Sequence, residues 1–215
     1  MATKVLIVDD HPAVREGLGT RIAEQADMEL CGQAADPAEA LKLVCDARPD
    51  VVVVDVHLKT ESGLGLVERI LAHDSSIRIL VCSMYPDALY AQRALRAGAL
   101  GYINKEHGTR RIIEAIRRVH EGKVFLCEET AEQLLGRTVG GNMPVMASGV
   151  QALSDRELEI FRLIGQGLGT AQIAEQLQRS SHTVEAHRQA IKRKLRLRTA
   201  AELNRSAVQW MLENG

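Results

Sequence analysis

The chain has 215 residues, enough for two small domains, and its 46% hydrophobic and 26% charged residues are typical of a globular protein. No segment approaches the roughly 18 apolar residues that cross a bilayer, so we expect no membrane partner. The net charge of -1 is unevenly divided: residues 150–215 carry ten Lys and Arg against seven Asp and Glu, whereas the remainder is acidic. A basic C-terminal part on an acidic body points to nucleic acid.

The cysteines and the N-terminus indicate the compartment. Cys31, Cys45, Cys82 and Cys127 show no C-x-x-C spacing, so we expect buried thiols in a reducing compartment, not a disulfide framework or a zinc site. The N-terminal apolar stretch has only four residues before two acids, which is too short for a signal peptide. We therefore expect a cytoplasmic protein.

Five apolar runs alternate with five helical patterns in the first 121 residues. The runs lie near residues 5–8, 28–34, 51–54, 77–82 and 100–103. The helical patterns lie at 12–25, 37–47, 64–72, 87–97 and 109–121, with Asp36 as the expected N-cap of the second. This alternation predicts an α/β fold with a five-stranded, doubly wound parallel sheet. Ligands of such sheets bind at the carboxyl ends of the strands.

The remainder of the chain changes character twice. We predict a linker over residues 125–149, because its end, TVGGNMPVMASG, has three Gly, one Pro and no charge. From Ser154, whose SDRE motif is a capping box, the pattern predicts four helices. A short helix, a tight turn and a cationic third helix form a helix-turn-helix pattern. The predicted domains are an α/β domain at 1–124 and an all-α, four-helix, helix-turn-helix domain at 150–215.

Acidic residues follow two of the apolar runs. Asp9 and Asp10 follow the first and Asp55 ends the third, so neighbouring parallel strands would bring the three carboxylates together. Close like charges favour protonation or a bound cation, and an all-oxygen set suits Mg²⁺. The fourth and fifth runs bring Ser83 and Lys105 to the same edge. This set favours phosphoryl transfer, with Asp55 as the nucleophile that forms an acyl phosphate.

Each of these residues also has a simpler interpretation by itself. Asp9 or Asp10 could cap the helix that begins near Pro12. A lone lysine after a strand is usually solvated, and a lone serine there is usually only polar. The phosphoryl-transfer hypothesis depends on all of these features meeting at one edge.

Residues 4–121 resemble the receiver domain of two-component response regulators. The resemblance rests on the paired acids, Asp55 with Gly63 eight residues on, Ser83, and GYINK with Lys105 fifty residues past Asp55. Residues 150–212 resemble the LuxR/FixJ-type output domain through LSDRELEIFRLIGQGLGTAQIAEQL and TVEAHRQAIKRKL. Their order is typical of the NarL/FixJ subfamily.

The resemblance implies a role for each matching residue. Asp55 would accept phosphate from a sensor histidine kinase. Asp10, Asp55 and the backbone carbonyl of His57 would bind Mg²⁺ directly, and Asp9 through water. Ser83 and Tyr102 would be the switch pair and Lys105 a phosphoryl contact. Phosphorylation would permit homodimerisation and binding to double-stranded DNA, with RNA polymerase a possible further partner.

The chain departs from the family pattern beside Asp55. The family usually has proline four residues after the phosphoacceptor, and here Lys59 stands there. The loop is therefore expected to be looser, which puts the lifetime of the phosphoryl group in doubt. His57 is expected to modulate hydrolysis and not to act as a catalyst.

Six cations and no acid occupy the segment RQAIKRKLRLR, residues 188–198. The alternation with Ile191, Leu195 and Leu197 is expected to turn one side of this segment into a small core and to leave the cations outside. Phosphate contacts supply affinity for DNA, and side chains near the start of the recognition helix read bases. By resemblance, the residues that hold the backbone would be Thr183, His187, Arg188, Lys192 and Lys194. Those that meet base edges would be Glu185, Ala186 and Gln189. A solvated basic face is the simpler alternative.

Three other functions are weighed against a phosphorylated regulator that is not an enzyme. A receiver-like regulator could work without phosphorylation. An aspartyl-phosphate phosphatase would want a second acid two residues after Asp55, where His57 stands, and room for a cap domain. A ligand-gated regulator would need an aromatic-lined pocket, and the chain has only one Trp, three Tyr and two Phe.

Overall fold

The computed structural model describes residues 2–58, 62–84, 88–139 and 149–214. The chain folds as two compact units, residues 1–136 and 137–215, and each is described by itself. Lys59 and most of the predicted linker's glycine-rich end lie outside the described residues. The predicted domain boundaries stay predictions.

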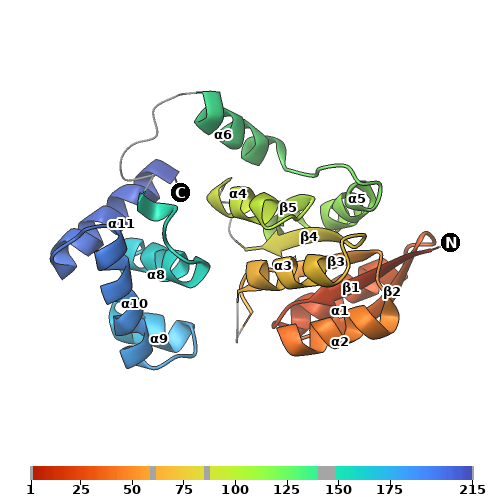
Figure 1. Ribbon diagram of the computed structural model, residues 1–215, viewed down its shortest axis with the longest axis horizontal. Helices are drawn as coiled ribbons and strands as arrows, with labels where there is room; N and C mark the ends of the chain where they lie inside the picture. The colour runs from red at the N-terminus through yellow and green to blue at the C-terminus, as the bar shows by residue number, and fades with distance from the viewer. Residues whose placement is uncertain (1, 59–61, 85–87, 140–148, 215) are drawn as a thin grey trace. The chain divides into compact units, whose positions relative to one another are not determined.

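The first unit is a five-stranded parallel sheet flanked by helices (Figure 1). Its strands are β1 Thr3–Val8, β2 Met28–Ala34, β3 Val51–Asp55, β4 Arg78–Ser83 and β5 Gly101–Asn104. The helices that alternate with them are α1 Pro12–Ala23, α2 Pro37–Ala47, α3 Gly63–His73, α4 Ala88–Arg96 and α5 Thr109–His120, with the 3₁₀ turn η1 Lys105–His107 after β5. The strand order β2-β1-β3-β4-β5 confirms the predicted fold class.

The strand order places the chain's acids beside one another. The strand β1 lies between β2 and β3, and Val8 pairs with Val54. The residues that follow this pair, Asp9 and Asp55, are therefore neighbours at the carboxyl edge. The prediction that the first and third strands are adjacent is confirmed.

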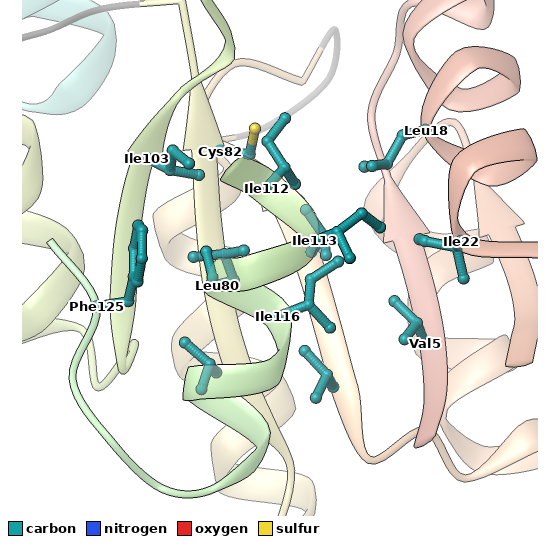
Figure 2. Close-up of a cluster of buried hydrophobic side chains, with 14 of the residues drawn as sticks. Val5, Leu18, Ile22, Leu80, Cys82, Ile103, Ile112, Ile113, Ile116 and Phe125 are labelled. Atoms are coloured by element: carbon teal, nitrogen blue, oxygen red, sulfur yellow. The ribbon is translucent and has the colours of Figure 1, made fainter. Parts of the chain in front are cut away.

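The sheet is buried on both faces, which explains the uninterrupted valines of β3. Figure 2 shows one of the two cores, in which Leu18 and Ile22 of α1 and Ile112 and Ile116 of α5 pack on one face. Alternate strand residues such as Val5, Val53 and Leu80 complete this cluster, because successive side chains of a strand point to opposite faces. The helices α2, α3 and α4 also pack against strands of the sheet, and α2 lies beside α3.

Two helix starts bear on the sequence predictions. Asp36 caps α2 as expected, because its side chain accepts hydrogen bonds from the backbone N–H groups of Ala38 and Glu39. The N-cap of α1 is His11, followed by Pro12. Neither Asp9 nor Asp10 is therefore the cap of α1, and both remain at the edge of the sheet.

The burial of the cysteines differs from the prediction at one position. Cys45 is exposed on α2, so the prediction that the thiols are buried is wrong there, although Cys82 and Cys127 are buried. The predicted linker contains a helix, α6 Glu128–Val139. Among the described residues, none of the helices has the length and apolar character needed to span a membrane.

The second unit contains the helices α8 Asp155–Gly165, α9 Thr170–Gln176, α10 Ser181–Lys194 and α11 Ala200–Asn214. Ser154 and Glu157 form the predicted capping box at the start of α8. The ring of Phe161 on α8 lies 5.9 Å from that of Trp210 on α11, in a core that also holds Ile173, Val184 and Ile191. The tight turn between α9 and α10 completes a helix-turn-helix.

Candidate functional site

Two acids and one lysine meet at the carboxyl edge of the sheet. The carboxylates of Asp9 and Asp55 are nearly buried, at 3% and 4% exposure. Lys105, at the end of β5, places its Nζ 2.6 Å from Asp9 Oδ2 and 2.8 Å from Asp55 Oδ2. The lysine is therefore held between two carboxylates, as expected for a cation that belongs to this site.

Asp10 lies beside this group, and His11, which was not predicted to belong to the site, lies next to Asp10. His11 Nδ1 lies 2.7 Å from Asp10 Oδ1 and 3.3 Å from Asp9 Oδ1. Ligand atoms of Asp9, Asp10, His11 and Asp55 all lie within 4.8 Å of one another. The only sequence signal for His11 is its position directly after the acid pair, which does not reveal the direction of its ring.

The predicted switch residues lie on the two adjacent strands. Ser83 ends β4 and is fully buried, and Tyr102 lies on β5 with 1% exposure. The backbone N–H of Tyr102 donates to the carbonyl of Phe125. The backbone N–H of His57 donates to the Asp55 carboxylate, while the His57 ring packs edge-on against Tyr90, with centroids 5.6 Å apart.

A cavity of about 290 Å³ adjoins the acids and the lysine. Its polar wall is formed by Asp9, Asp55 and Lys105, and most of the rest is apolar surface from β1, α1 and α5. The carboxyl edge of the sheet is therefore next to open space and is not sealed by packing.

Gly63 begins α3 at the back of this site. Its N–H donates to the Val56 carbonyl over 2.7 Å. A β-carbon built on Gly63 would lie only 1.8 Å from the carbonyl oxygen of Asp55. This close approach gives a physical reason for the glycine eight residues after Asp55.

The helix α10 of the second unit places the predicted DNA contacts in different surroundings. Glu185, Ala186 and Gln189 are exposed, and Gln189 Nε2 donates to Glu185 Oε1 over 2.7 Å. Thr183, His187 and Lys192 are half-buried. Burial, followed by the charge of Arg156, lowers the pKa of His187 below its ordinary value, so its ring is neutral at pH 7.

Two cations of the basic segment point toward partners inside the unit. The side chain of Arg188 is only 11% exposed, and its Nη2 donates to Asn204 on α11 over 3.3 Å. Lys194 Nζ lies 2.6 Å from Glu157 Oε2, part of the α8 capping box. The expectation that the cations of this segment all remain outside is wrong for Arg188, because packing against α11 turns its guanidinium inward.

Comparison with known proteins shows which family the chain belongs to. Residues 5–117 match the response regulator receiver domain, and residues 151–207 match the bacterial regulatory proteins of the luxR family. The chain is a response regulator. The oxygen regulatory protein NreC of Staphylococcus carnosus is 37% identical over 204 residues, which cover 93% of this chain and 94% of that protein.

Solved structures of other response regulators share this fold. ChrA, from a heme-sensing two-component system, has 29% identity and a TM-score of 0.53, with 98% of each chain covered. RcsB from Salmonella enterica serovar Typhimurium, bound to the promoter rprA with a phosphomimetic, has 22% identity and a TM-score of 0.62, with 97% of this chain and 99% of that one covered. This response regulator is accordingly a phosphorylation-dependent transcription regulator, with a receiver domain and a LuxR-type DNA-binding domain.

The acidic pocket of this response regulator fits the Mg²⁺ that receiver domains generally use. Carboxylate oxygens are the donors that this hard cation prefers. Asp10 Oδ1 is buried and has no hydrogen-bond partner, because His11 Nδ1 lies near it but outside hydrogen-bond geometry. A buried oxygen without a donor is costly, and a bound cation would satisfy it.

Burial dominates the electrostatics of Asp55. It raises the pKa of Asp55 to about 6; the charge of Asp9 adds to this rise and that of Lys105 opposes it. Burial lowers the pKa of Lys105, but the charges of Asp55 and Asp9 outweigh it, so this pKa lies above its ordinary value. The lysine therefore stays charged at neutral pH, while Asp55 carries a charge that the fold disfavours.

We expect Asp55→Asn to stabilise the receiver domain at neutral pH in metal-free buffer. Because the pKa of Asp55 is about 6 when folded and near 3.8 when unfolded, the folded state binds more protons in between. The wild type should therefore lose stability as pH rises through this window, leaving the variant more stable by roughly 2–3 kcal/mol at pH 7.5. Urea unfolding followed by far-UV circular dichroism measures this difference. It should vanish near pH 4, and a difference independent of pH would contradict the assigned pKa.

Proposed function

We propose that Asp55 is the phosphoacceptor of this response regulator and that a sensor histidine kinase is its phosphodonor. The observation that carries the proposal is the position of the Asp55 carboxylate, buried beside Asp9 and 2.8 Å from Lys105 Nζ, with a cavity next to it. A carboxylate with a fixed cation at its side and open space before it can attack an incoming phosphoryl group.

In the proposed reaction an Asp55 oxygen attacks phosphorus, the phosphorus–nitrogen bond of the donor phosphohistidine breaks, and an acyl phosphate forms. Lys105 then pairs with the new phosphoryl oxygens, and the Ser83 hydroxyl contacts them. Asp10, Asp55, the His57 carbonyl and, through water, Asp9 would hold Mg²⁺. When bound, the ion neutralises charge on the transferred group and lowers the pKa of Asp55.

The switch is proposed to run through β4 and β5. The turning of Ser83 toward phosphate makes room for movement of Tyr102, and this shifts the receiver domain to a state that homodimerises and permits DNA binding. RNA polymerase is a possible further partner. Free cysteines throughout are consistent with a cytoplasmic site of action.

A phosphatase is the alternative that experiment can test. A phosphatase would turn over free phosphomonoesters, but the residue two positions after Asp55 is His57, whose ring packs on Tyr90 and supplies no second carboxylate. The proposed function is therefore regulatory and not enzymatic.

The DNA surface is proposed to lie on α10, with the half-buried Lys192 on phosphate and the exposed Gln189 at a base edge. Glu185 and Ala186 would also contact base edges, while Thr183 and His187 would contact the DNA backbone. Arg188 and Lys194 are assigned mainly to orientation of α10, through Asn204 and Glu157. A direct contact of either with phosphate would require it to leave that partner.

We expect acetyl phosphate with Mg²⁺ to strengthen DNA binding, and two variants to weaken it differently. Lys192→Ala should weaken binding to all duplexes and lower the salt slope by about one unit. Gln189→Ala should relax preference at one base position, at a cost of roughly 1–3 kcal/mol, with little change of slope. Titration of specific and scrambled duplexes at several salt concentrations separates these effects.

Lys42→Ala is the matched control, because it removes an exposed cation from α2 of the first unit. It should leave affinity and slope unchanged. An unchanged slope for Lys192→Ala would mean that α10 does not face DNA. Equal affinity with and without phosphodonor would mean that phosphorylation does not act through DNA affinity.

A further inference from the structure

His11 is the one residue of the acid cluster that offers nitrogen as a donor. Its side chain is 65% exposed, yet Nδ1 is the ring atom that approaches the acids. The backbone N–H of the same residue donates to Asp9 Oδ1 over 2.9 Å. This hydrogen bond, together with Pro12 directly after it, anchors His11 at the start of α1.

The spacing of these atoms suits ligands of one metal ion. His11 Nδ1 lies 2.7 Å from Asp10 Oδ1 and 3.3 Å from Asp9 Oδ1. Two adjacent ligands of an octahedral ion, each about 2.1 Å from it, are separated by about 3 Å. His11 Nδ1 and Asp10 Oδ1 therefore lie about as far apart as two neighbouring ligands of one cation.

Lys105 leaves these donor atoms available. It pairs with the Oδ2 atoms of Asp9 and Asp55, whereas His11 approaches Oδ1 of Asp9 and Oδ1 of Asp10. Asp10 Oδ1 is also the buried oxygen without a hydrogen-bond partner. The oxygen in need of a cation is thus the one beside the imidazole.

We propose that His11 is a direct ligand of the divalent cation and makes this receiver domain prefer first-row transition ions over Mg²⁺. The inference rests on the proposed metal site and adds a nitrogen donor to it. Imidazole suits the first-row transition ions, among which Mn²⁺ binds it most weakly, whereas Mg²⁺ favours oxygen and keeps its waters. A mixed oxygen and nitrogen set therefore raises affinity for Mn²⁺ more than for Mg²⁺.

Electron paramagnetic resonance of the full chain with Mn²⁺ tests this assignment, because free and bound Mn²⁺ give distinct signals. Electron spin echo measurements should show coupling to a ¹⁴N nucleus in the wild type and none in His11→Gln. The same variant should weaken Mn²⁺ binding by about tenfold and, since Mg²⁺ depends on oxygen, change Mg²⁺ binding measured by calorimetry by less than about twofold.

His57→Gln identifies the source of the nitrogen, since His57 is the other histidine beside Asp55. Coupling should persist in that variant, and loss of coupling there with retention in His11→Gln would overturn the assignment. Bound Mn²⁺ without nitrogen coupling in the wild type would reduce His11 to an ion-pair partner of Asp10. Failure of both Mg²⁺ and Mn²⁺ to bind would instead overturn the underlying metal site.

Discussion

Asp55→Asn should abolish transfer of a phosphoryl group to this response regulator. In the presence of Mg²⁺ and acetyl phosphate, or of a phosphorylated kinase, the wild type should gain one base-labile phosphoryl group, and the variant none. The reason is that an amide is no nucleophile here, while Lys105 can still pair with Asp9 at 2.6 Å. Intact-protein mass spectrometry after brief incubation measures the added mass.

Loss of labelling cannot be ascribed to unfolding if the variant is more stable than the wild type at neutral pH, as expected from the raised pKa of Asp55. Asp50→Asn provides a control at an exposed acid just before β3. It should label like the wild type. Labelling of Asp55→Asn at the wild-type rate would show that another residue accepts the group, whereas persistence of labelling with chelator would argue against the cation.

Gly63→Ala should be strongly destabilising and should displace Asp55 at the same time. The added β-carbon would lie 1.8 Å from the carbonyl oxygen and 2.8 Å from the carbonyl carbon of Asp55, so backbone must move. We expect a loss of roughly 2–4 kcal/mol from the free energy of unfolding. Displacement of Asp55 should also slow phosphoryl transfer by on the order of 10–100-fold.

The chain offers a matched control on the same helix. A β-carbon at Gly65 meets nothing within 4 Å, so Gly65→Ala should be neutral or stabilising by about 0.5–1 kcal/mol. Urea unfolding by far-UV circular dichroism measures both variants. The fluorescence of Trp210, the single tryptophan, reports the second unit and should change little. Equal stability of the two variants would contradict the close approach of Gly63 to Asp55.

Much of the receiver site could be predicted because it depends on where strands end. An acid or a lysine directly after an apolar run must lie at the carboxyl edge of a parallel sheet, whatever the helices do. Asp9, Asp55 and Lys105 met this condition, and they lie within salt-bridge distance. His11 did not, since a residue at the first turn after a strand can turn its ring either toward the edge or toward solvent.

By itself, the sequence determined the alternation of elements, the parallel sheet and the helix-turn-helix, because hydrophobic period and capping residues act locally. Only the tertiary structure decided which cations of α10 face outward. Arg188 and Lys194 find partners 16 and 37 residues away, Asn204 and Glu157, and their long side chains can turn toward either a core or solvent. Sequence spacing cannot reveal such partners, since they come together only when α8, α10 and α11 pack against one another.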